Sequence, residues 1–189
     1  MSRPGLVIIG ASTGGPGVVG GILGLLPPLP ASVIVVQHMP RFINESFVRT
    51  LGKQPSMRVR LIRDGDLLEA GTVYVAPSDV HCTLVLDRTF HLAAGPRVNY
   101  VCPSIDVTME SVRTPASERA LVGVLLTGMG RDGAAGMGHL KRLGALTLAQ
   151  NERTSAVYGM PAEAVKLGCV DRSLSPEGIA REVASWWMG

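Results

Sequence analysis

Short apolar runs alternate with amphipathic stretches along most of this chain. The apolar runs are rich in β-branched residues and stop at small or polar residues, as buried strands of a parallel sheet do. These runs lie at residues 6–9, 32–37, 72–76, 120–126 and 146–149. Apolar residues at helical spacing predict helices over residues 17–26, 42–51, 104–112, 134–143 and 161–167, with a last helix capped by Ser175. The alternation indicates an α/β fold with a doubly wound, mostly parallel sheet and helices on both faces, a Rossmann-like architecture.

Two further segments complete the predicted fold. Residues 58–63 alternate charged and apolar side chains, which favours a strand near the edge of the sheet. Residues 83–87 and 90–93 flank a short turn and predict an antiparallel hairpin. The side chains that the last helix is expected to bury are Ile179, Val183 and Trp186. No repeat or linker divides the chain, so residues 1–189 are expected to form one domain.

The composition narrows the classes of function. Hydrophobic residues make up 46% and charged residues 17% of the chain, as in a compact folded protein. Glycines and prolines interrupt the only long apolar stretch, at residues 17–30, so no membrane insertion is expected, and the first residues do not resemble a signal peptide. A net charge of +3, scattered arginines and 4% aromatic residues argue against a nucleic-acid partner.

The cysteines and most histidines offer no metal-binding pattern. Three cysteines, at positions 82, 102 and 169, fit no metal-ligand spacing and are expected to be buried or free thiols in a reducing cytoplasm. The remaining candidates for ligands, His81, His91 and His139, are interpreted as structural or exposed. We therefore expect no metal and no cofactor, and a cytoplasmic location.

The first apolar run ends in small residues that could form a site. Gly10-Ala-Ser-Thr-Gly-Gly15 follows the strand directly, and Pro16 can open a helix. Ser12 lies between small neighbours, so its hydroxyl is expected to be reachable from solvent. The loop has two interpretations, a nucleophilic serine or a glycine-rich cradle for phosphate. For a single serine at a helix start, a capping role is the commoner one.

Polar residues also end two other predicted strands. His38 follows the run 32–37, and Asp132 follows the run 120–126. Taken singly, each is more often a strand-end or turn residue than a catalytic one. Because carboxyl ends of parallel strands meet at one edge of a sheet, all three side chains are expected in one crevice. Serine, imidazole and carboxylate are the parts of nucleophilic acyl transfer, and glycines around Ser12 and at 128–130 leave N–H groups accessible for an oxyanion.

Two better-known sites fit the sequence poorly. Gly10-Ala-Ser-Thr-Gly14 matches the G-x-S-x-G nucleophile elbow, but only eleven residues precede the serine and the histidine precedes the aspartate, unlike in α/β-hydrolases. A dinucleotide site is also disfavoured, because the G-x-G-x-x-G spacing is missing and the second strand ends in Gln37-His38 instead of an acid.

Six separated motifs, taken in order, resemble one known family. They are Ile9-Gly-Ala-Ser-Thr-Gly-Gly-Pro16, Val36-Gln-His-Met-Pro40, Val75-Ala-Pro77, Pro103-Ser-Ile-Asp106, Leu126-Thr-Gly-Met-Gly-Arg-Asp-Gly-Ala134 and Val157-Tyr-Gly-Met-Pro161. Together they are similar to the catalytic domain of the chemotaxis protein-glutamate methylesterases (CheB), over nearly the whole chain. The resemblance implies that residues 1–189 are one such domain, which hydrolyses glutamate γ-methyl esters on the helical cytoplasmic region of methyl-accepting chemotaxis receptors and often deamidates glutamines.

The same resemblance implies a role for individual residues. Ser12 is then the nucleophile, His38 the base and Asp132 the orienting acid, while Thr13 and Met129 support the serine and the oxyanion. Family members usually carry an N-terminal receiver domain, whereas here the first motif starts within ten residues of Met1. We therefore expect an activity that does not respond to phosphodonors. The alternatives are a non-catalytic module that binds an anion at the Ser12 helix, and a serine hydrolase of small molecules.

Overall fold

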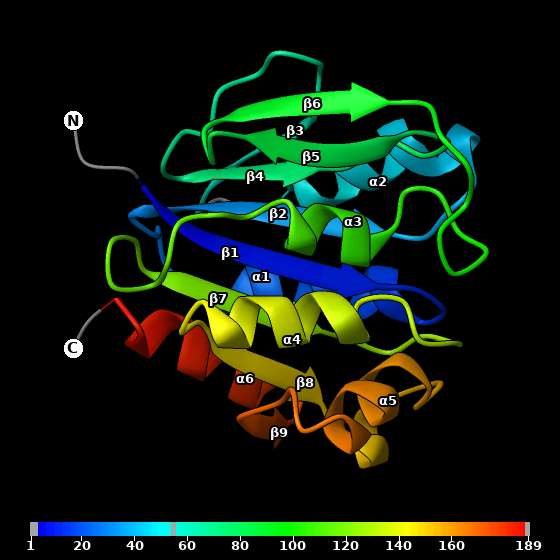
Figure 1. The fold of residues 1–189 in the computed structure, drawn as a ribbon, viewed down its shortest axis with the longest axis vertical. Coiled ribbons are helices and arrows are strands. Elements are labelled where there is room, and N and C mark those ends of the chain that lie inside the picture. The colour runs from blue at the N-terminus through cyan, green and yellow to red at the C-terminus, as the bar shows by residue number, and fades with distance from the viewer. Residues whose placement is uncertain (1–3, 54–55, 188–189) are drawn as a thin grey trace.

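A computed structural model describes residues 4–53 and 56–187 of the chain (Figure 1). Its main sheet contains β1 (Gly5–Ala11), β2 (Ala31–Gln37), β3 (Arg58–Leu61), β4 (Thr72–Val75), β7 (Leu121–Leu125), β8 (Leu146–Gln150) and β9 (Arg172–Leu174). The strands lie in the order β3-β4-β2-β1-β7-β8-β9, and every neighbouring pair is parallel. The predicted doubly wound architecture is therefore confirmed.

Helices cover both faces of this sheet. One face packs against α1 (Gly15–Leu25), α2 (Asn44–Leu51) and α6 (Pro176–Ser185). The other packs against α3 (Ile105–Glu110), α4 (Ala134–Arg142), α5 (Met160–Lys166) and an antiparallel hairpin of β5 (His81–Val85) and β6 (Thr89–Ala93). Successive residues of β1 alternate between the two cores, with Val7 and Ile9 in one and Leu6 and Ile8 in the other. This two-sided burial explains why the strand reads as a continuous apolar run.

The chain reverses its direction of winding at β1. β2 and β4 lie on one side of β1 and β7 and β8 on the other, so β1 is the central strand at which the two halves of the sheet meet. Because all these strands are parallel, their carboxyl ends lie at the same edge, as the arrowheads of β1 and β8 show in Figure 1. In doubly wound sheets a crevice opens outside the carboxyl ends at such a point, and ligands bind there.

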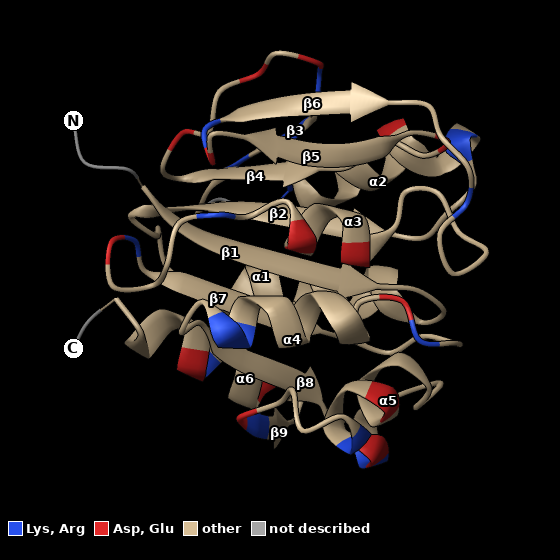
Figure 2. Cartoon of the chain, viewed as in Figure 1, with Lys and Arg blue, Asp and Glu red and all other residues tan. Residues whose placement is uncertain are grey.

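Charged side chains are absent from the three central strands of the sheet. No Asp, Glu, Lys or Arg occurs in β1, β2 or β7, and Figure 2 shows charged positions in loops, in helices and in the edge strand β9. In the part of the chain that the structure describes, no helix is long and apolar enough to cross a bilayer. Two short 3₁₀ turns, Arg41–Ile43 and Glu152–Thr154, lie in loops that follow strands β2 and β8.

Two expectations about the last third of the chain were incomplete or wrong. Strand β9 was not predicted, because its three residues contain a single apolar side chain. Trp186 is 41% exposed and not buried as predicted, although its N–H still donates to the carbonyl of Glu182 at the end of α6. The tryptophan that packs against the core from this end is Trp187. The predicted edge strand and hairpin are both confirmed, as β3 and as β5 with β6.

Candidate active site

All three residues predicted at strand ends lie at the carboxyl edge of the sheet. Ser12 directly follows β1, His38 directly follows β2, and Asp132 lies between β7 and α4. Ser12 and His38 are partly exposed, whereas Asp132 is only 2% exposed. Parallel pairing of β1 with both β2 and β7 brings the three loops together, as expected for a doubly wound sheet.

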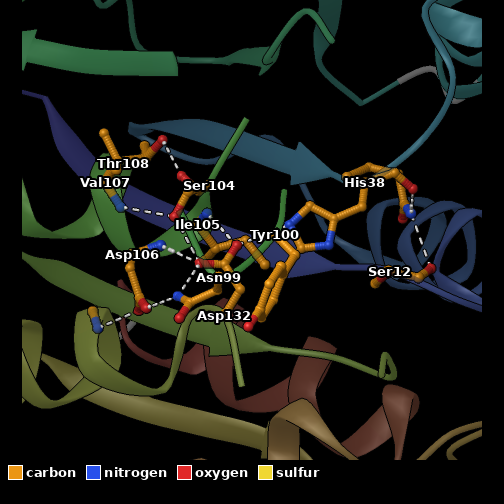
Figure 3. A network of polar contacts seen from close by, with 12 residues as sticks. Ser12, His38, Asn99, Tyr100, Ser104, Ile105, Asp106, Val107, Thr108 and Asp132 are labelled. Carbon is orange, nitrogen blue, oxygen red and sulfur yellow. Dashed lines mark hydrogen bonds and ion pairs between the residues drawn. The ribbon is translucent and has the colours of Figure 1, made fainter. Parts of the chain in front are cut away.

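His38 and Asp132 form a close pair. Nε2 of the imidazole lies 2.9 Å from Oδ2 of the carboxylate, across 94 positions of sequence (Figure 3). A carboxylate accepts, so Nε2 carries the hydrogen and Nδ1 of the neutral ring carries the lone pair. His38 is also fixed through its backbone, because its N–H donates to the carbonyl of Ala11 at 2.9 Å. The structure therefore leaves Nδ1 as the basic atom of the ring.

The carboxylate of Asp132 receives hydrogen bonds on both oxygens from the start of α3. Oδ2 accepts the N–H of Ile105 at 2.7 Å, and Oδ1 accepts the hydroxyl of Ser104 at 2.7 Å and the N–H of Asp106 at 3.2 Å. Burial alone would raise the pKa of Asp132, but the hydrogen bonds from His38, Ser104 and Ile105 outweigh it and hold that pKa below its ordinary value. Asp132 therefore stays ionised and faces His38 in a fixed orientation.

The first turns of α3 and α4 exchange caps. Asp132, just before α4, accepts N–H groups at the start of α3, and Asp106, in the first turn of α3, accepts the N–H of Gly136 in α4 at 2.7 Å. Gly133, the residue before α4, has no side chain with which to cap it. Burial raises the pKa of Asp106, and the charge of Asp132 adds to the shift although the Gly136 hydrogen bond opposes it. The two helices thus hold the acid of the candidate site between them.

The backbone of Ser12 is held from both neighbouring strands. Its N–H donates to Thr127 at 2.9 Å, and the amide Nε2 of buried Gln37 donates to the carbonyls of both Ser12 and His38 at 2.9 Å. Ser12 is not a cap of α1, because the capping position belongs to Gly14, which adopts a φ of 80°. The structure records no hydrogen bond from the Ser12 hydroxyl to the imidazole of His38. Loose contacts of this kind are common before substrate binds.

Two N–H groups beside Ser12 are available for an oxyanion. Among the described residues, no acceptor is recorded for the backbone N–H of Thr13 or of Met129. The expectation that Gly128 also offers its N–H was wrong, because this group donates to Val157 at 3.0 Å. Gly128 serves a different need, since a Cβ at that position would lie 2.6 Å from the Cβ of Ser12. Its lack of a side chain lets the loop that carries Met129 approach the serine closely.

Comparison with known proteins assigns the chain to a family. The family model for CheB methylesterase matches residues 7–183. The chain belongs to the CheB methylesterase family. It is 46% identical over 176 residues to a protein-glutamate methylesterase/protein-glutamine glutaminase of Symbiobacterium thermophilum, covering 93% of this chain and 48% of that protein. A second such protein, from Syntrophus aciditrophicus, is 39% identical over 183 residues, covering 94% of this chain and 52% of that protein.

A solved structure of the same family has the same fold. The CheB methylesterase catalytic domain of Thermotoga maritima superimposes with a TM-score of 0.89 at 32% identity, covering 97% of this chain and 98% of that one. The chain spans about half the length of the curated CheB relatives it matches. Its whole described fold therefore corresponds to a catalytic domain of this family.

Sequence reasoning missed the residues that support the candidate site in this CheB family member. Gln37, Ser104 and Asp106 all lie in motifs that carry the family resemblance, but no role was predicted for them. Asn99, which donates to the carboxylates of Asp106 and Asp132, lies outside those motifs. For Ser104 a signal existed, since a serine before an apolar helix is a capping pattern, and its hydroxyl does accept the N–H of Val107.

The remaining histidines have structural contacts. His81 accepts the N–H of Ser104 through Nδ1 at 3.2 Å, and His139 contacts the carbonyl of Val112 at 2.8 Å. His91 is exposed and lies 3.2 Å from Asp64. Within residues 4–53 and 56–187, no three His, Cys, Asp or Glu side chains are grouped so that they could hold a metal ion. No residues are therefore assigned to a metal or a cofactor.

Proposed function

We propose that this chain is a serine hydrolase that demethylates glutamate γ-methyl esters on methyl-accepting chemotaxis receptors and also deamidates glutamines there. Ser12 is the nucleophile, His38 the general base and Asp132 the acid that orients it. The observation that carries the proposal is the 2.9 Å contact between His38 and Asp132 beside the Ser12 loop. The names of the relatives support the choice of ester and amide, since both are described as methylesterase and glutaminase.

The reaction proceeds through an acyl-enzyme. Oγ of Ser12 attacks the γ-carbonyl carbon while its proton passes to Nδ1 of His38, and the imidazolium is stabilised by Asp132. The oxyanion accepts hydrogen bonds from the N–H groups of Thr13 and Met129. As the carbonyl re-forms, the bond to methoxide breaks and His38 returns the proton, so methanol leaves, or ammonia from glutamine. Water then attacks the ester of Ser12 by the same steps and releases a free glutamate.

The reaction uses only side chains and backbone N–H groups of this chain, together with water. Ser12 and His38 are partly exposed at the edge of the sheet, so a side chain on the surface of another protein can reach them. We propose that the substrate is the cytoplasmic region of a receptor and that the chain acts in the cytoplasm. We propose that the described residues together form one catalytic domain.

The test is methanol release from a methylated receptor fragment by purified protein. Ser12→Ala should reduce the rate to the background without changing the circular dichroism spectrum, because a small loop side chain contributes little to packing. Ser185→Ala is a matched control, since this exposed serine in α6 bonds only within its own helix. Turnover by Ser12→Ala at the wild-type rate would contradict the proposal and favour a site that merely binds an anion.

A further inference from the structure

Asn99 and Tyr100 lie next to each other in a tight turn, but their side chains point in different directions. Val98 and Val101 exchange two backbone hydrogen bonds, at 3.0 and 3.1 Å, so Asn99 and Tyr100 form a two-residue turn. Both have positive φ, 51° and 66°, a conformation in which asparagine is among the most tolerated residues other than glycine. Tyr100 is 90% exposed, whereas Asn99 is partly buried. The turn therefore directs the Asn99 amide into the protein.

The amide of Asn99 lies between two carboxylates. Its Nδ2 donates to Oδ2 of Asp106 at 2.8 Å and to Oδ1 of Asp132 at 3.2 Å, as Figure 3 shows. Its Oδ1 accepts the Nε–H of Arg131 at 3.0 Å. This guanidinium contact fixes which end of the amide faces the acids. Both amide hydrogens and the amide oxygen are thus engaged, and the orientation of the side chain is determined.

Two carboxylates this close repel each other unless something donates between them. Asp106 and Asp132 are 6% and 2% exposed, so water provides little screening. Without a bridging donor, one acid would take up a proton or the two would move apart. The raised pKa of Asp106, caused first by burial and then also by the charge of Asp132, is consistent with this repulsion. The Asn99 amide supplies two hydrogens and no negative charge, so both acids can remain ionised.

Asn99 also donates to the Asp132 carboxylate from a segment other than the start of α3. The other groups that hold the carboxylate in place, apart from His38, come from Ser104, Ile105 and Asp106, which are consecutive. A carboxylate held from one side can still tilt about its own bonds. A donor from a separate turn, acting on Oδ1, resists that tilt and keeps Oδ2 directed at Nε2 of His38.

We propose that Asn99 is a positioning residue of the CheB site, which bridges Asp106 and Asp132 and so holds the orienting acid toward His38. This inference rests on the proposed triad. Loss of the bridge should lower the activation of Ser12 without weakening the binding of substrate. A displacement of about 1 Å at a reacting group costs on the order of 10²-fold in rate, so losses of about 10- to 100-fold are expected.

The decisive variant is Asn99→Gly. Glycine adopts positive φ more readily than asparagine, so the turn should persist while the amide is removed. With the methylated receptor fragment, kcat should fall about 10- to 100-fold at unchanged KM. Asn99→Asp, which keeps the size but places a third carboxylate between two, should lose at least as much. Arg131→Met removes the group that orients the amide and should show a smaller loss in the same direction.

A second readout does not depend on the receptor. A sulfonyl fluoride modifies an activated serine with loss of fluoride, and mass spectrometry locates the modification. Wild-type protein should be labelled at Ser12 and Asn99→Gly should be labelled about 10- to 100-fold more slowly. The matched control is Thr147→Val, which removes a buried 2.9 Å hydroxyl donor to Asp171 near the opposite edge of the sheet. This variant should lower the melting temperature but leave the labelling rate unchanged.

The outcomes separate the inference from the proposed function. If wild-type protein is not labelled at Ser12 and releases no methanol, the triad is wrong and the inference falls with it. If wild-type protein is labelled and Asn99→Gly reacts at the same rate, only the role of Asn99 is wrong. If Asn99→Gly fails to fold, the test is made with Arg131→Met instead. A kcat and a labelling rate equal to those of wild-type protein in Arg131→Met would then overturn the proposal.

Discussion

Replacing Asp132 by asparagine tests the acid of the candidate triad. The substitution keeps the size of the side chain but replaces one carboxylate oxygen by an amide nitrogen. Oδ2 faces the Nε2–H of His38, so an amide nitrogen in its place stabilises the wrong tautomer, with the hydrogen on Nδ1. If the amide nitrogen instead replaces Oδ1, the contact is kept but the negative charge that stabilises the imidazolium is lost. In serine proteases the equivalent change costs about 10⁴ in kcat. We expect a loss of about 10³- to 10⁴-fold, or about 4–5 kcal/mol of transition-state stabilisation at 1.36 kcal/mol per factor of ten.

The same substitution should also destabilise the fold. Each oxygen of Asp132 accepts a backbone N–H, from Ile105 on Oδ2 and from Asp106 on Oδ1. Whichever oxygen becomes nitrogen, one of these buried donors loses its acceptor. An unsatisfied buried donor costs about 1–3 kcal/mol, so the free energy of unfolding should fall by about that amount.

The loss of stability should depend on pH. The pKa of Asp132 is lowered in the folded protein, so its stabilising effect is present above the unfolded value of about 3.9 and disappears as the pH falls through the folded value. Wild-type protein and Asp132→Asn should therefore differ most near neutral pH and converge below about pH 4. Urea unfolding followed by circular dichroism between pH 3 and pH 7 measures this difference.

Two results would refute this reasoning about Asp132. Methanol release by Asp132→Asn within about tenfold of the wild-type rate, in folded protein, would remove the acid from the mechanism. A difference in unfolding free energy that is constant across the pH range would show that the carboxylate is not ionised and hydrogen-bonded as described. Asp171→Asn is the control, because Asp171 also accepts a backbone N–H, from Thr147, but lies far from His38.

Two other residues give shorter tests. Gln37→Met removes the donor to the carbonyls of Ser12 and His38 and should lower kcat about tenfold at unchanged KM; steady-state kinetics with unchanged kcat would exclude a role in positioning. Burial raises the pKa of the Cys82 thiol to about 12, so this thiol should react with a disulfide reagent only in denaturant. Rapid titration of all three thiols in the native protein would contradict the buried position of Cys82.

The fold could be predicted because buried strands have a recognisable pattern of apolar residues in the sequence. Strands covered on both faces, such as β1 and β2, must be apolar throughout, and their ends are marked by small or polar residues. β9 has no such pattern, since Arg172–Leu174 pairs through its backbone with β8 and exposes most of its side chains. The prediction for Trp186 was wrong because two adjacent tryptophans follow the apolar spacing of α6, and it is Trp187 that contacts the core.

The catalytic candidates could be predicted because strand ends fix their positions. Once β1, β2 and β7 are known to be parallel, the residues that follow them must lie at one edge. The supporting residues have no such rule. Asn99 acts through partners 7 and 33 positions away, and nothing in the sequence places its turn beside Asp132. Gln37 is visible as a polar end to an apolar strand, but its two acceptors are backbone carbonyls, which carry no sequence signal.

Because α3 and α4 exchange caps, the three candidate catalytic residues differ in how much the fold would be destabilised by their replacement. Ser12 contributes a hydroxyl that bonds to nothing recorded among the described residues, so it can be removed at little structural cost. Asp132 joins two helices as well as contacting His38. A relative that had given up hydrolysis but kept the fold would be expected to lose the serine first and to retain the aspartate long after its chemical purpose had gone. The presence of the aspartate alone is therefore poor evidence that a protein with this fold is still an enzyme.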